Sequence, residues 1–106
     1  MITVKVEYDG AGSVTGWQVR GHAGSSSGDY DLVCNSVSVV TQAPVLGLER
    51  YLKRHPRLEV DEDAGVLSVT LDEVDAETQA VAMTMVVTLE SLAQRYPQYV
   101  RLEEQR

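Results

Sequence analysis

The sequence contains few of the residues from which disulfides, metal sites or an aromatic core are built. Its 106 residues include one cysteine, two histidines, one tryptophan and no phenylalanine. One cysteine cannot form an internal disulfide, which favours a reducing compartment, and one cysteine with two separated histidines gives no zinc-binding pattern. We therefore expect no metal or other cofactor, a cytoplasmic location and a core of aliphatic side chains.

Positive charge is also scarce. The formal net charge is -7, and residues 58–94 hold nine acidic residues but no lysine or arginine. Because phosphate binding needs a basic face, this balance argues against direct contact with nucleic acid and favours a basic protein or peptide as partner. Arg50, Lys53, Arg54 and Arg57 form the opposite, basic cluster. We interpret both charged stretches as solvated surface.

Long hydrophobic runs are missing as well. No apolar run approaches the roughly 20 residues that a membrane helix requires. The first residues, "MITVKVEY", are typical of a strand and lack the basic-then-apolar pattern of a signal peptide. The length is that of one domain. We therefore expect a single domain over residues 1–106 with no membrane attachment.

The alternation of apolar residues predicts two hairpins. Residues 2–8 and 14–22 read as strands joined by the turn "DGAGS", with Trp17 and Val19 as packing residues. Residues 58–71 read as a second hairpin, with "DEDAG" as its turn.

Helical spacing follows each hairpin. The first helix is expected to begin after Asp31 as its N-cap, and Pro44 to kink or break it. The second has Asp75 as its cap and ends at Pro97, before a short extended tail. The order β-β-α-β-β-α predicts an α/β (α+β) two-layer sandwich, with two helices on an antiparallel or mixed four-stranded sheet.

The stretch "GHAGSSSGDYDLVCNSVS", residues 21–38, holds His22 and the only cysteine, Cys34. If Asp31 is the cap, Cys34 lies in the first turn of a helix, where free N–H groups and the helix dipole stabilise a thiolate. His22 could accept the thiol proton and later protonate a leaving amine. The residues alone leave an alternative open, in which Cys34 is a small buried hydrophobe and His22 a loop residue.

The motifs "GHAG" and "DYDLVCNSVS", separated by a glycine-containing loop and followed by a long helix, resemble the signature of the Prp-type ribosomal-processing cysteine proteases. This resemblance implies a homodimeric cysteine endopeptidase (a hydrolase, or thiol protease) of ribosome biogenesis. Such enzymes remove the N-terminal extension of a basic precursor, the bacterial large-subunit ribosomal protein numbered twenty-seven. They cut it after an aromatic residue, through a thioacyl-enzyme intermediate. The resemblance makes Cys34 the nucleophile and His22 the general base, with Gly21, Asp31 and Ser38 at further positions around the site.

Several roles within this site stay open. Asp31 either caps the helix or orients His22, although a carboxylate close to Cys34 would raise the pKa of the thiol. Ser38 lies one helical turn beyond Cys34 and either bonds to the thiol region or bonds back to a carbonyl. Backbone N–H groups of residues 33–35 could form an oxyanion hole.

The sequence also departs from the family pattern. Asn35 and Ser36 stand where the family commonly has alanines, and Pro44 interrupts the expected helix. The alternative function is therefore a catalytically silent, dimeric ribosome-associated binding module with the same fold.

Overall fold

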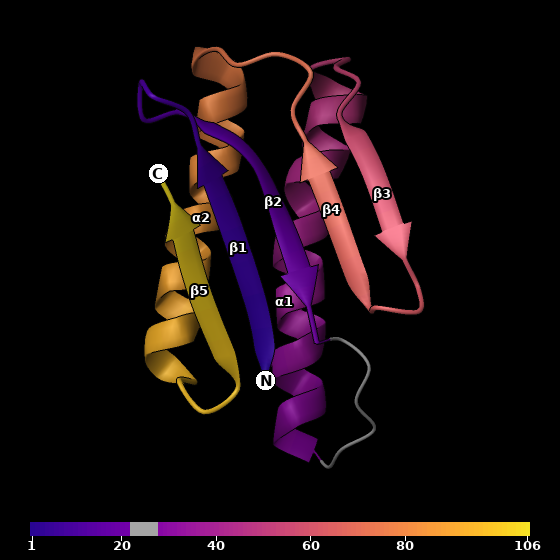
Figure 1. The fold of residues 1–106 in the computed structure, drawn as a ribbon, viewed down its shortest axis with the longest axis vertical. Coiled ribbons are helices and arrows are strands. Elements are labelled where there is room, and N and C mark those ends of the chain that lie inside the picture. The colour runs from indigo at the N-terminus through magenta and orange to yellow at the C-terminus, as the bar shows by residue number, and fades with distance from the viewer. Residues whose placement is uncertain (22–27) are drawn as a thin grey trace.

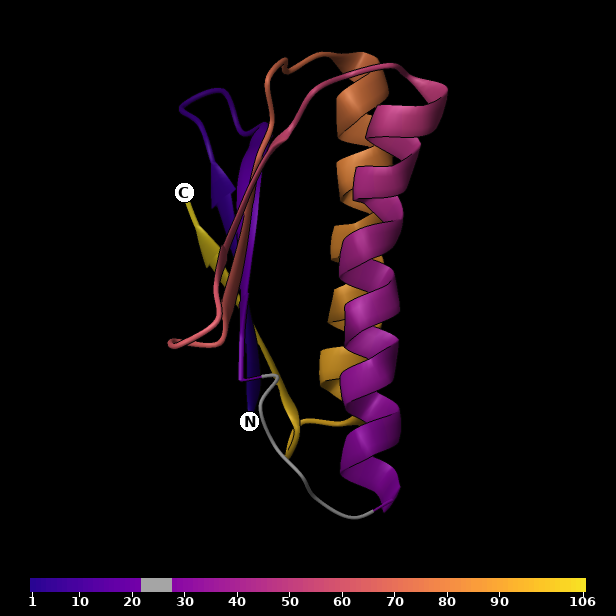
Figure 2. The ribbon, with the colours of Figure 1, turned by 90° about the vertical axis from the view of Figure 1, so that its right-hand side faces the viewer.

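The computed structural model describes residues 1–21 and 28–106, and their side chains at 1–21 and 32–106. Two helices lie side by side against one face of a sheet (Figures 1 and 2), which confirms the predicted two-layer α+β sandwich. The elements, in chain order, are β1 (Ile2–Tyr8), β2 (Val14–Arg20), α1 (Gly28–Leu46), the π-helical turn η1 (Gly47–Tyr51), β3 (Arg57–Asp61), β4 (Val66–Thr70), α2 (Ala76–Arg95) and β5 (Val100–Gln105).

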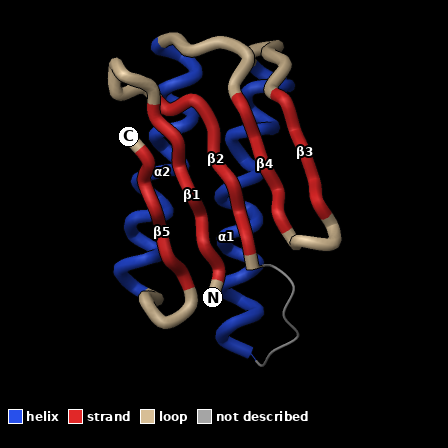
Figure 3. The backbone as a smooth tube through the Cα atoms, in the orientation of Figure 1, coloured by secondary structure: helices blue, strands red, loops and turns tan. Residues whose placement is uncertain are grey.

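The sheet has five strands rather than the four predicted. Their order is β3-β4-β2-β1-β5, and β5 pairs in parallel with β1 while the other pairs are antiparallel (Figure 3). The fifth strand is the expected extended tail. It joins the sheet because Val100 lies opposite Ile2 in the register and is 2% exposed. The sheet is therefore mixed, with β3 and β5 at its edges.

Both predicted hairpins are confirmed, and they supply the inner face of the sheet. The apolar residues of β1 are fully buried, and Trp17 and Val19 of β2 are 1% and 0% exposed. Directly opposite residues point to the same face of a sheet. The rows Val6–Trp17–Val69 and Val4–Val19–Leu67 therefore face the helices.

The start of α2 is held by the cap that the sequence predicts. The Asp75 carboxylate accepts the Thr78 N–H at 3.0 Å, and the Thr78 hydroxyl accepts the Asp75 N–H at 3.0 Å. The Thr78 N–H and then the Arg54 guanidinium, which lies 2.8 Å from Asp75, lower the pKa of that carboxyl. Arg54 also pairs with Glu73 and Glu77 and is only 15% exposed. The interpretation of the basic cluster as solvated surface is therefore wrong for Arg54.

The start of α1 differs from the prediction. The helix begins at Gly28, so Asp31 lies in its first turn and is not the N-cap. An aspartate is favourable at both places, because the helix dipole stabilises a carboxylate anywhere in the first turn. The residue type alone therefore did not fix the boundary.

Pro44 does not break α1 as expected. The helix continues through it to Leu46 and then widens into η1, where the Leu52 N–H donates to the Gly47 carbonyl at 3.1 Å. An interior proline costs a helix about 3 kcal/mol. Here Pro44 is buried. The packing of Val37 in α1 and Leu48 in η1, both 0% exposed, offsets that cost.

The stretch Leu32–Tyr51 is long and apolar enough to cross a membrane, by length and composition only. This contradicts the expectation that no run approaches that length. About 33% of the stretch is buried inside the protein, and core helices of globular proteins meet the same criterion. One such helix is therefore a weak indication of a membrane span.

Candidate active site

Cys34 lies on the side of α1 that borders the core. Its side chain is half-buried and packs against the core cluster, beside Val33 and Val37, which are 3% and 0% exposed. The thiol position is therefore fixed by a packed helix while part of the side chain remains accessible. This combination is what a nucleophile on a rigid element needs.

The helix position of Cys34 differs from the prediction. Cys34 stands six residues after Gly28, in the second turn of α1 rather than the first. Only the first four N–H groups of a helix lack partners within it, so the N–H groups of residues 33–35 take part in the helix. The expected oxyanion hole from these three groups is therefore wrong.

His22 falls outside the described residues, so its pairing with Cys34 stays a prediction. Its neighbour Gly21 is described and has a φ of +90°. A Cβ atom there would collide with the backbone carbonyl oxygen of Met1, so only glycine fits where the chain leaves β2. The end of β2 and the first half of α1 lie at the same end of the molecule (Figure 1).

The other predicted site residues divide between two sides of α1. Ser38 follows Cys34 by one turn and is half-buried like it, so both belong to one helix face. The side chain of Asp31 lies outside the description, although its backbone belongs to α1. Asn35 and Ser36 are exposed, and the Ser36 hydroxyl donates to the Leu32 carbonyl at 2.9 Å. Of the three departures from the family pattern, Asn35 and Ser36 therefore face outward, whereas Pro44 is buried.

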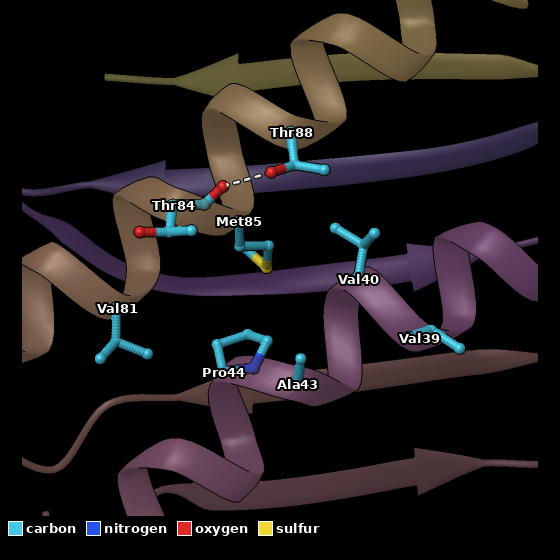
Figure 4. Close-up of a pocket in the computed structure, with 8 residues that line it drawn as sticks. All are labelled: Val39, Val40, Ala43, Pro44, Val81, Thr84, Met85 and Thr88. Atoms are coloured by element: carbon cyan, nitrogen blue, oxygen red, sulfur yellow. Dashed lines mark hydrogen bonds between the residues drawn. The ribbon is translucent and has the colours of Figure 1, made fainter.

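Sequence reasoning missed several hollows that border α1 in the described part of the chain. A groove of about 380 Å³ separates α1 from α2 on the side away from the sheet (Figure 4). A second hollow of about 300 Å³ lies between α1 and the β3–β4 hairpin. Within the described residues, no group of three or more His, Cys, Asp or Glu side chains could hold a metal ion.

Comparison with known proteins decides the family. Residues 1–101 match the family described as cysteine protease Prp. The chain belongs to this family. The ribosomal processing cysteine protease Prp of Staphylococcus aureus is 28% identical over 103 residues, which are 96% of this chain and 97% of that protein.

Solved structures agree with this relationship. The crystal structure of the essential ribosomal processing protease Prp of S. aureus with a substrate peptide has a TM-score of 0.90 and 25% identity, covering 99% of this chain and 100% of that one. A protein of Streptococcus mutans has a TM-score of 0.89 at 24% identity, covering 99% and 97%, which supports the fold alone. As a member of the Prp family, the chain is a cysteine protease.

Proposed function

We propose that Cys34 is the nucleophile and His22 the general base of an endopeptidase that processes a ribosomal protein. One observation carries the assignment of the nucleophile: a cysteine protease requires a cysteine, and this chain has only one. Its half-buried position on a packed helix supports the same role. Gly21 supports the role of His22, because it turns the chain away from β2 at the end of the molecule that holds Cys34.

The reaction follows from thiol chemistry. His22 takes the proton of the Cys34 thiol, and the thiolate attacks the carbonyl carbon of the scissile peptide bond. The tetrahedral intermediate collapses as the C–N bond breaks, and His22 returns the proton to the leaving amine. Water activated by His22 then hydrolyses the thioacyl-enzyme, which releases the new carboxylate and restores the thiol.

Two further residues have supporting roles in this proposal. Asp31 is not the helix cap, so its remaining assignment is to orient His22, and it precedes Cys34 by three residues in α1. Ser38 lies one turn after Cys34 on the same face, where its hydroxyl can bond to the thiol region. Both are positioning residues rather than reacting groups.

The proposed substrate is the basic precursor of the large-subunit ribosomal protein numbered twenty-seven, processed in the cytoplasm. A net charge of -7 attracts a basic chain and repels RNA. The S. aureus relative is named a ribosomal processing protease and was crystallised with a substrate peptide. These two observations support a peptide cut from a ribosomal protein.

We also propose that the protein is a homodimer joined through the outer surface of its helix layer. Neither Leu32–Leu46 nor Thr78–Leu89 contains a charged residue, although 24% of the chain is charged. Val39 and Val87 are 67% and 53% exposed there. A surface that is both apolar and without charge is typical of an interface between subunits, and the negative charge of each copy lies elsewhere.

A cleavage assay tests the catalytic assignment. The probe is a synthetic peptide spanning the N-terminal extension of the host's ribosomal protein and the residues after it, followed by mass spectrometry. Cys34→Ala and His22→Ala should lower kcat/KM by about a thousandfold or more. Ser36→Ala, which changes an outward-facing hydroxyl two residues away, should leave it unchanged. Cleavage by Cys34→Ala would overturn the nucleophile, and binding without cleavage by the wild type would favour the silent binding module.

Sedimentation tests the dimer. Val39→Asp and Val87→Asp should each shift the protein to a monomer, because an unpaired carboxylate would be buried between copies. Val60→Asp is the matched control, since Val60 is 65% exposed but lies on β3. A wild-type monomer, or a dimer that dissociates only with Val60→Asp, would contradict the assigned surface.

A further inference from the structure

The helices leave the inner face of edge strand β3 uncovered. Leu58 and Val60 belong to rows that continue inward through β4 and β2, as Leu58–Val69–Trp17 and Val60–Leu67–Val19. The inner members of these rows face the helix layer, so Leu58 and Val60 face the same side. Exposure rises outward along one row from 1% at Trp17 through 2% at Val69 to 46% at Leu58.

The shape of the molecule accounts for this exposure. α1 passes behind β2 and β4, and the β3–β4 hairpin leans away from α1 toward its turn (Figures 1 and 2). The resulting hollow of about 300 Å³ is here named the α1–β3 crease. It is lined by Gln42, Val45, Leu46, Glu49, Leu58 and Leu67.

The chemistry of the α1–β3 crease suits an apolar side chain on a basic peptide. Four of its six lining residues are aliphatic, and Glu49 supplies one carboxylate. Its volume lies at the small end of the range of about 300–1,000 Å³ that ligand pockets occupy. The exposed acidic residues Glu62 and Asp63 stand at the nearby hairpin turn. A second copy of this chain, also charged -7, would meet these carboxylates with like charge.

The α1–β3 crease lies in line with the thiol. Cys34, Ser38, Gln42, Val45 and Glu49 recur at intervals of three and four residues, so they form one stripe along α1 and η1. At a rise of about 1.5 Å per residue, the crease begins about 12 Å from Cys34 and ends about 22 Å from it. An extended peptide covers about 3.3 Å per residue and needs roughly four to seven residues to span this distance.

We infer that the α1–β3 crease is a specificity subsite that receives an apolar side chain of the peptide substrate, roughly four to seven residues from the scissile bond. The inference rests on the proposed function, because it takes Cys34 as the reacting group. The crease holds the side chain, and the carboxylate of Glu49 in its lining pairs with a basic residue of the same peptide. The enzyme then selects its substrate at two places along α1, at Cys34 and at the α1–β3 crease, rather than by the residues next to the scissile bond alone.

A set of peptide and protein variants tests the subsite. Each apolar residue three to seven positions from the cut, on either side, is replaced by alanine in the synthetic substrate. With wild-type enzyme, one replacement in this window should lower kcat/KM by about tenfold or more. With Leu58→Ser the same replacement should lower it less than about twofold, because the contact is already lost. Leu46→Ser, on the opposite wall of the crease, should reduce the penalty in the same way. Val74→Ser, an exposed position between β4 and α2 that lies outside both proposed surfaces, should behave as wild type.

Binding gives a second readout that is independent of turnover. Trp17 is the only tryptophan and is separated from Leu58 by Val69 alone. In the Cys34→Ala protein, peptide binding should therefore change the tryptophan fluorescence. The dissociation constant should rise about tenfold on adding Leu58→Ser and stay unchanged on adding Val74→Ser.

The outcomes separate the two proposals. If Leu58→Ser and Leu46→Ser show the wild-type penalty at every peptide position, the subsite is wrong while the protease assignment stands. If Leu58→Ser instead dissociates a dimer, the α1–β3 crease belongs to the contact between copies and the subsite is again wrong. If wild-type enzyme cuts none of the peptides and none of them binds to the Cys34→Ala protein, the proposed function itself fails.

Discussion

The two helices of this protein cover the same sheet but are built in different ways. α2 begins with a reciprocal capping box between Asp75 and Thr78, and Arg54, in the segment before β3, forms an ion pair with Asp75. α1 carries Pro44 in its interior and ends in a π-helical turn. The only cysteine lies on α1, and the α1–β3 crease of about 300 Å³ lies beside the same helix.

This difference indicates that the two helices have different roles, one in stability and one in catalysis. α2 has a complete cap and five buried residues at helical spacing, among them Leu89, so its local sequence signals agree with its fold. α1 breaks the proline rule and gives up regular hydrogen bonding near its end. Local rules are broken most often where function requires it. α2 is therefore the scaffold, and α1 is the helix that presents the chemistry.

The largest effect on stability should come from the core of α2. Leu89→Ala removes a side chain that is 0% exposed and should lower the free energy of unfolding by about 2–5 kcal/mol. The kcat/KM of the molecules that remain folded should change less than about twofold, because Leu89 belongs to α2 and not to the helix that carries Cys34. Urea unfolding and an assay at low temperature measure the two quantities. A tenfold loss of kcat/KM in the folded fraction would contradict the conclusion that α2 contributes to stability and not to catalysis.

The matching change in α1 should affect both quantities. Val37 is also 0% exposed, and Val37→Ala should cost about 1–3 kcal/mol, less than Leu89→Ala because the cavity is smaller. It also lies three residues from Cys34, so relaxation around the cavity shifts the thiol. A displacement of this kind should lower kcat by about tenfold or more with little change in KM. If Val37→Ala left kcat unchanged, catalysis would be as insensitive to cavities in α1 as to cavities in α2, and the proposed difference between the helices would be wrong.

The sequence predicts most of the scaffold because its signals there are local. The strand alternation of "ITVKVEY" and the cap at Asp75 each depend on a few neighbouring residues, and both are confirmed. The fifth strand was foreseen only as an extended tail. Its parallel pairing with β1 joins the two ends of the chain, and no local pattern encodes such a contact.

The site was harder to predict for the opposite reason. Cys34 is found from its residue type, but its helix turn depends on where α1 begins, and aspartate is favourable at several positions there. Pro44 predicts a break only if packing is ignored. The α1–β3 crease arises because the β3–β4 hairpin leans away from α1 (Figure 2), so the sequence of either element alone does not reveal it.

The smallest effect separates charge from capping at the start of α2. Asparagine caps a helix as well as aspartate does, so Asp75→Asn should keep the bond from the Thr78 N–H and lose only the attraction to Arg54. In the folded protein the pKa of Asp75 is lowered below its ordinary value of 3.8. Its stabilising effect is therefore present in full above that value and is lost as the pH falls through the lowered pKa.

The variant should accordingly have a lower Tm than the wild type near neutral pH, and the two melting curves should converge at a pH below about 4. Glu62→Gln removes an exposed carboxylate from the hairpin turn and should show no such convergence. Arg54→Met provides the partner test: with the guanidinium absent, Asp75→Asn should cost much less than it does in the wild type. A Tm difference that does not depend on pH, or that persists without Arg54, would contradict this prediction. It would mean that the capping hydrogen bonds alone stabilise the start of α2, and that the ion pair with Arg54 does not distinguish α2 from α1.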